Sequence, residues 1–127
     1  MNEDKKERIS KLLKQVSELS DEQREAIAGK IGLINPEGHI LSIRNQCLLY
    51  FQAGDKPLSV VAGFRQWQKY NRIVSKGQHG YLIMVPSKKQ SEKTESAKDE
   101  EGNETFFLYK TVFDISQTEE YKLQEVA

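Results

Sequence analysis

The side chains in this 127-residue chain that are best suited to chemistry are cationic and aromatic, and they are concentrated in one segment. Residues 41–89 contain eight Lys or Arg residues against one acid, Asp55, although the whole chain has 19 basic and 19 acidic residues. Trp67, Tyr70 and Tyr81 are interleaved with these charges. A cationic surface that also presents flat rings suits a polyanion with exposed bases. The segment therefore predicts noncovalent binding of a nucleic-acid strand.

Few residues could support catalysis. His39 and His79 lie in unrelated predicted loops, and Cys47 lies among residues of a type that is usually buried. The sequence has no His-Glu-x-x-His, Cys-x-x-Cys or Walker-type glycine motif, and a zinc site needs three or four suitably spaced ligands. We therefore expect no metal, no cofactor and no catalytic residue, with Cys47 as a core thiol. A nucleophile–base pair of Cys47 and His79 is the open alternative.

Length and composition predict one small domain. Hydrophobic residues make up 37% of the chain and charged residues 30%, which is ordinary for a globular protein. No apolar run approaches the roughly 20 residues needed to cross a bilayer, and the N-terminus lacks the hydrophobic stretch of a secretory signal. A single cysteine is compatible with a reducing compartment. These features predict a cytoplasmic protein with no membrane partner.

The first part of the chain is predicted to be helical. Apolar residues recur there at helical spacing, namely Ile9, Leu12, Leu13, Val16 and Leu19. Ser20 followed by Gln23 predicts a capping box that begins a second helix, which runs toward Gly29. Gly29, Gly32 and Asn35-Pro36 are stop and turn signals after it. We interpret residues 1–38 as an N-terminal helical hairpin and residues 39–127 as the main domain.

The main domain is predicted to mix helices and strands. The expected elements are a helix from its N-cap Ser42 to Ala53, a strand over 58–62, a helix over 64–71, a β-hairpin of 73–74 and 81–85 around a turn at 76–80, and a long central strand over 105–115. Residues 88–104 have no apolar side chain larger than Ala97, so we expect a mobile polar loop. The predicted fold class is α+β, a small antiparallel sheet flanked by helices.

Three short motifs occur in a fixed order within the main domain. They are Leu41-Ser42-Ile43-Arg44-Asn45-Gln46, then Trp67-x-x-x-x-Arg72-x-Val74-x-Lys76-Gly77-x-x-Gly80, then Val112-Phe113-Asp114-Ile115-Ser116-Gln117-Thr118-Glu119. Over residues 41–121 the chain resembles the N-terminal single-stranded-DNA-binding domain of ArdC-type antirestriction proteins, which are found on plasmids, phages and integrative elements. The resemblance implies a non-catalytic domain that binds single-stranded DNA with little sequence preference and serves mobile DNA.

The same resemblance implies a possible partner. ArdC-type proteins usually continue into a metallopeptidase-like domain with a His-Glu-x-x-His helix, whereas this sequence ends at Ala127. The chain is therefore expected to be either a stand-alone copy of the binding domain or a fragment of a longer protein.

The candidate DNA contacts combine charge with position near the motifs. They are Arg44, Asn45, Arg65, Lys69, Arg72, Lys76, Tyr81 and Lys88. Arg44 and Asn45 are equally consistent with bracing a helix start. Trp67 is expected in the core, and Gly77 and Gly80 are expected to supply positive φ in a turn.

A second class of function is also consistent with the sequence. The helical hairpin and the basic residues could form a protein-interaction module that docks an acidic partner such as a restriction subunit. If the domain binds DNA, DNA binding should survive removal of residues 1–35. Docking of a protein partner need not survive that removal.

Overall fold

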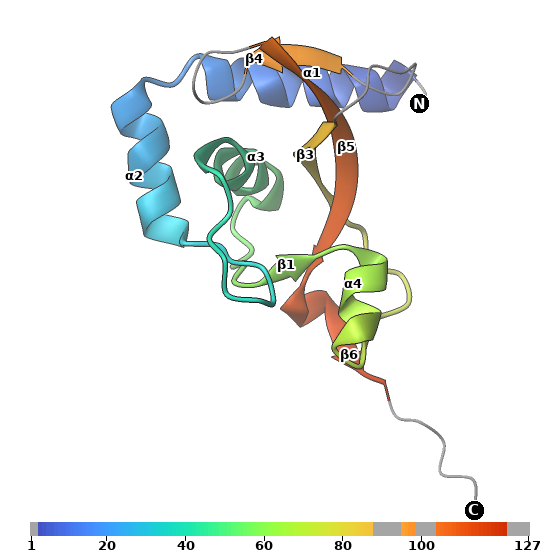
Figure 1. Ribbon diagram of the computed structural model, residues 1–127. Helices are drawn as coiled ribbons and strands as arrows, with labels where there is room; N and C mark the ends of the chain where they lie inside the picture. The colour runs from blue at the N-terminus through green and yellow to red at the C-terminus, as the bar shows by residue number, and fades with distance from the viewer. Residues whose placement is uncertain (1–2, 88–94, 99–103, 122–127) are drawn as a thin grey trace, which may run out of the picture.

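The computed structural model describes residues 3–87, 95–98 and 104–121, which form an α+β domain (Figure 1). In chain order the elements are α1 (Glu3–Ser17), α2 (Asp21–Ile31), α3 (Ile43–Ala53), β1 (Val61–Ala62), α4 (Phe64–Lys69), β2 (Arg72–Val74), β3 (Tyr81–Ser87), β4 (Glu95–Lys98), β5 (Glu104–Asp114), a 3₁₀ helix (Ile115–Gln117) and β6 (Thr118–Glu120). The predicted fold class is confirmed. The described strands form two antiparallel sheets where the sequence predicted one.

Helix α3 is the centre of the fold. It contacts α1, α2 and β3, which surround it in Figure 1. Ser42 caps it as predicted, because the Ser42 hydroxyl accepts a hydrogen bond from the Asn45 N–H at 3.2 Å. One core cluster comprises Leu12, Val16, Cys47, Leu48, Met84 and Phe107, and a second comprises Leu33, Leu49, Val61, Ile83 and Val112. The N-terminal helix α1 therefore shares a core with α3 and β3. Removal of residues 1–35 would open this core, so the expectation that DNA binding survives the truncation no longer holds.

The capping box at the beginning of α2 is confirmed, and of the stop signals after it Gly32, not Gly29, ends the helix. The Ser20 hydroxyl accepts from the Gln23 N–H at 3.1 Å, and the Gln23 side chain accepts from the Ser20 N–H at 2.8 Å. The helix continues through Gly29 and ends at Gly32, which has a left-handed backbone with φ of +49°. A glycine inside a helix costs only about 1 kcal/mol, so it is the left-handed cap that ends α2.

Strand β5 is the central strand, as predicted. It pairs with β3 from Tyr81↔Val112 to Ser87↔Phe106, and it also pairs with β1 and β4. The strand predicted over 58–62 is shorter, because only Val61–Ala62 pairs with β5 as a strand.

The predicted hairpin between residues 73–74 and 81–85 is wrong. Strand β2 pairs with β6 near the end of the chain, and β3 pairs with β5. The Ser75 N–H donates to the Gln117 carbonyl at 2.9 Å, which continues the β2–β6 contact. Residues 75–80 therefore connect two sheets. Their glycines indicated a turn, but they could not indicate which strands pair across it.

The predicted polar loop over 88–104 contains a strand that the sequence did not suggest. Residues 95–98 form β4 and pair with β5, from Glu95↔Phe107 to Lys98↔Glu104. The rest of the loop lies outside the described residues, so its mobility stays a prediction.

Two side-chain amides of α3 cover the edge of β3 that faces away from β5. Asn45 donates to the Met84 carbonyl at 2.8 Å and accepts from the Met84 N–H at 2.9 Å. Gln52 does the same with Leu82, at 2.7 and 2.8 Å. A strand edge in a folded core needs partners for its backbone groups. The spacing of Asn45 and Gln52, about two helical turns, supplies them from one face of α3.

Candidate nucleic-acid interface

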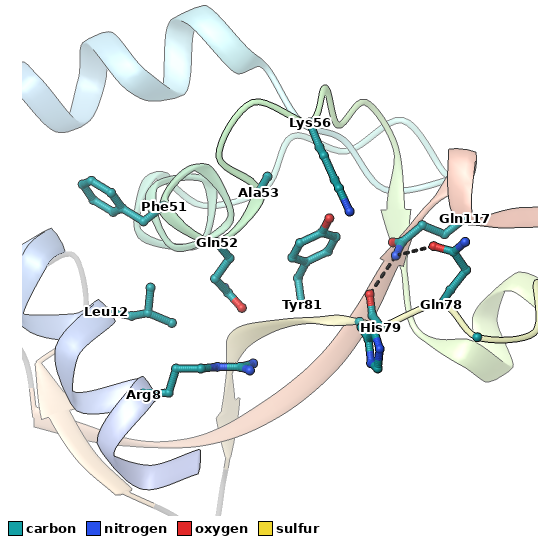
Figure 2. A pocket seen from close by; sticks show the side chains of 12 residues that line it. Arg8, Leu12, Phe51, Gln52, Ala53, Lys56, Gln78, His79, Tyr81 and Gln117 are labelled. Carbon is teal, nitrogen blue, oxygen red and sulfur yellow. Dashed lines mark hydrogen bonds between the residues drawn. The ribbon is translucent and has the colours of Figure 1, made fainter. Parts of the chain in front are cut away.

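A pocket of about 600 Å³ opens between α1, the end of α3 and residues 77–81 (Figure 2). This volume falls within the range of about 300–1,000 Å³ that is typical of small-ligand sites. Its walls are part apolar, from Leu12 and Phe51, and part polar, from the turn that contains His79. Tyr81, at the start of β3, also lines the pocket and is only partly buried.

The charge of this pocket is positive. Arg8 of α1 and Lys56, which follows α3, line it together with His79, and none of the lining residues that the structure describes is Asp or Glu. Figure 2 shows the Arg8 and Lys56 side chains on opposite sides of the Tyr81 ring. Both cationic side chains are exposed, and neither forms an ion pair with any residue that the structure describes. We call this site, defined by Arg8, Phe51, Lys56, His79 and Tyr81, the cationic pocket.

Gln117 fixes the turn that forms one wall of the cationic pocket. Its Nε2 donates to the His79 carbonyl at 2.7 Å and to the Gln78 Oε1 at 3.3 Å (Figure 2). Its Oε1 accepts from the Asp114 N–H at 2.8 Å. The Asp114 carboxylate accepts in turn from the Ser59 N–H at 2.7 Å. Asp114 and Gln117 are both buried. The third sequence motif therefore holds a pocket wall in place.

The two glycines of this turn are required for different reasons. Gly77 has φ of +86°, which other residues rarely adopt, as predicted. Gly80 does not have positive φ. A Cβ there would collide with the Thr111 side chain and lie 3.0 Å from the Val112 carbonyl oxygen. Close packing against β5, and not backbone conformation, accounts for Gly80.

The predicted contacts on α3 face the protein. Asn45 uses its amide on the edge of β3. The Arg44 guanidinium lies 5.2 Å from the centroid of the Phe107 ring, a cation–π geometry, and the residue is partly buried. These contacts favour the bracing role for both residues.

The predicted DNA contacts on α4 are exposed to solvent. Arg65 and Lys69 are both exposed, and Tyr70 beside them is 42% exposed. Trp67 of the same helix is 2% exposed, and its Nε1 donates to the Phe113 carbonyl at 2.9 Å, so its predicted core position is confirmed. α4 and the Tyr70 that follows it therefore offer two cations, Arg65 and Lys69, and two rings, Phe64 and Tyr70, to solvent.

The remaining predicted residues divide in three ways. Arg72 is partly buried and donates to the Thr118 hydroxyl at 2.7 Å and to the Thr118 carbonyl at 3.2 Å, which links β2 to β6. Lys76 is exposed and directly precedes the pocket wall at Gly77. Tyr81 lies in the cationic pocket, and Lys88 lies outside the described residues.

Sequence reasoning did not select Arg8, Phe51, Lys56 or His79 as contacts. Arg8 lies in a helix with many other charges, and Lys56 lies in an ordinary Gly-Asp-Lys-Pro turn. Nothing in the local pattern separates them from solvated surface residues. Only the packing of α1 beside α3 and β3 brings Arg8 to the same pocket as Tyr81.

Cys47 is a core thiol, as predicted. It is 0% exposed, and burial raises the pKa of its thiol while the charge of Arg24 lowers it. A raised pKa keeps the thiol protonated, which makes it a poor nucleophile. Within the described residues, no three His, Cys, Asp or Glu side chains come together as a metal site. No described helix has the length and apolar character needed to cross a bilayer.

The fold and the cationic pocket define a small α+β domain that presents positive charge and aromatic rings around a cavity. The family model described as the N-terminal domain of anti-restriction factor ArdC matches residues 3–113, so the chain belongs to this family. The match includes the N-terminal helices, which lie outside the resemblance seen in the sequence. It ends before Gln117.

Solved structures agree with this assignment at the level of the fold. The chain is similar to the metal-free crystal structure of the antirestriction ArdC protein from plasmid R388, with 20% identity and a TM-score of 0.53 over 80% of this chain and 37% of that chain. The Mn(II)-bound structure of the same protein gives 18% identity and a TM-score of 0.50, over 80% and 39%. The chain thus spans about two fifths of the length of that protein. No curated protein sequence matches it significantly.

Proposed function

We propose that this domain binds single-stranded DNA with little sequence preference and does no chemistry itself. The observation that carries the proposal is the cationic pocket, where Arg8 and Lys56 flank the Tyr81 ring and no acid is found among the described lining residues. Unpaired bases stack on aromatic side chains, and phosphates are attracted to Lys and Arg. Duplex DNA offers the charges but hides the base faces, which favours a single strand.

The polar groups of the pocket support low sequence preference. Base-specific recognition needs side-chain donors and acceptors that are free to reach base edges. The Gln52 amide is bonded to Leu82 and the Gln117 amide to His79 and Asp114. A third amide that lines the pocket, that of Gln78, accepts from the Gln117 Nε2 through its Oε1. Two of the three lining amides are therefore engaged by backbone groups, and the cations and rings around them accept any base.

Flanking cations extend the proposed path of the strand. Lys76 is exposed next to the pocket wall, and Arg65 and Lys69 are exposed on α4. Of the eight contacts predicted from the sequence, we retain Arg65, Lys69, Lys76, Tyr81 and Lys88 in the proposed interface. We propose that Arg44, Asn45 and Arg72 support the fold.

The biological role that we propose follows from the family. The R388 protein is an antirestriction protein of a plasmid, and its chain is longer than this one. We propose that this domain acts on DNA of mobile elements in the cytoplasm. In a longer protein it would deliver DNA to a C-terminal metallopeptidase-like domain.

Fluorescence anisotropy with a labelled single strand tests the proposal. Lys56→Gln and Arg8→Gln each remove one pocket charge, so each should weaken binding and make the log–log salt slope shallower by about 0.7. Lys14→Gln is the matched control, because Lys14 is an exposed residue of α1 that does not line the pocket. Equal losses of DNA affinity in all three variants would show that binding depends on the total charge of the protein and not on the pocket. No binding by the unaltered chain would favour the alternative, an acidic protein partner.

A further inference from the structure

We infer that the cationic pocket holds one complete nucleotide of the strand, with its base against Tyr81 and its phosphate between Arg8 and Lys56. This inference rests on the proposed function and deepens it. A surface groove would let the strand pass over the protein. A pocket would instead take one nucleotide out of the stack of its neighbours, which only an unpaired base allows at low cost.

The shape and the chemistry of the cavity fit a nucleotide whose base contacts Tyr81 and whose phosphate contacts the cations. Its volume of about 600 Å³ lies well within the usual range for small ligands. Leu12 and Phe51 provide apolar wall area near the partly buried Tyr81 ring, which suits the face of a base. Arg8 and Lys56 come from different elements and flank that ring, which suits the phosphate attached to the same nucleotide.

The backbone of the turn adds donors for an anion. Residues 77–80 all line the pocket. Among the described residues, the one N–H in this turn with a hydrogen-bond partner is that of Gln78, which donates to the Ser75 carbonyl at 3.2 Å. The N–H groups of Gly77, His79 and Gly80 remain for solvent or a ligand. Successive backbone N–H groups in a turn form a common anion site.

The wall is held in place before any ligand arrives. Gln117 fixes the His79 carbonyl, and β3–β5 pairing fixes Tyr81 opposite Val112. A pocket that is already ordered loses little conformational entropy on binding. A single free nucleotide should therefore bind measurably, without the rest of the strand.

The experiment is a titration of the full chain with deoxyadenosine monophosphate (dAMP), deoxyadenosine and inorganic phosphate, followed by NMR. We expect dAMP to shift resonances of residues 77–81 and to bind more tightly than either deoxyadenosine or phosphate. Tyr81→Leu should weaken dAMP by about fivefold or more, the lower end of what base–aromatic stacking provides. Tyr81→Phe keeps the ring and should retain affinity, and Lys14→Gln should behave like the unaltered chain.

Other outcomes would overturn the inference. Phosphate that binds as tightly as dAMP would mean an anion site without base recognition. Shifts confined to α4, or equal losses in Tyr81→Leu and Lys14→Gln, would place the nucleotide elsewhere. A strand that binds while dAMP does not would refute the nucleotide pocket and leave the proposed function intact. If neither the strand nor dAMP binds, both the nucleotide pocket and the proposed function are refuted.

Discussion

Replacing Asn45 with alanine separates a DNA contact from a structural amide. In the structure the Asn45 side chain satisfies both the N–H and the carbonyl of Met84, a residue that is 4% exposed. Leaving a buried backbone group without a partner costs about 1–3 kcal/mol. Two such groups predict a loss of about 2–6 kcal/mol in the free energy of unfolding. Denaturation in urea, followed by circular dichroism, measures this loss.

The control and the DNA measurement complete this test. Gln15→Ala alters an exposed residue of α1 and should change the free energy of unfolding by no more than about 0.5 kcal/mol. Under conditions where Asn45→Ala remains folded, its salt slope for single-stranded DNA should equal that of the unaltered chain, because no charge is lost. Unchanged stability together with a tenfold loss of DNA affinity would refute the structural role and return Asn45 to the interface.

Four further substitutions test other parts of the fold and the interface. Trp67→Ala should lower the free energy of unfolding by about 3–5 kcal/mol, because the side chain is in the core; a stable variant with weaker DNA binding would contradict this. Arg72→Gln should mainly lower the melting temperature, because its guanidinium links strands β2 and β6. Lys76→Gln should leave the melting temperature close to that of the unaltered chain and make the log–log salt slope for DNA binding about 0.7 shallower. Gly80→Ala should destabilise the fold through its collision with Thr111, and an unaltered melting curve would show that the turn can shift without cost.

Local signals in the sequence predicted local structure well. The caps at Ser20 and Ser42 depend on residues three positions apart, and both form as expected. The core position of Trp67 and the central position of β5 followed from apolar spacing. Such features could be predicted because the residues that determine them are neighbours in the chain.

Pairing over long distances could not be predicted. Strand β2 has three residues, and its partner β6 lies more than 40 positions later. Nothing in either segment specifies the other, whereas the glycines at 77 and 80 favoured a hairpin with β3. Arg72 was predicted as a DNA contact because nothing near it in the sequence indicated its hydrogen-bond partner, Thr118, which lies 46 positions later.

The candidate site was predictable only in part. Tyr81 and Lys76 were selected because they lie beside a glycine turn in a cationic segment. Arg8 and Lys56 come from other elements, and no local pattern distinguishes them from surface charges. The motif at 112–119 carried part of the resemblance, but its effect on the pocket wall through Gln117 appears only in the folded chain.

A competition between single-stranded and duplex DNA tests the central proposal most directly. Oligonucleotides of equal length and sequence would be titrated with the full chain at two salt concentrations. The account predicts tighter binding of the single strand at both concentrations, with a log–log salt slope near −3 if about four cations neutralise phosphates. Equal affinity for the duplex, or an affinity that does not change with salt, would contradict it.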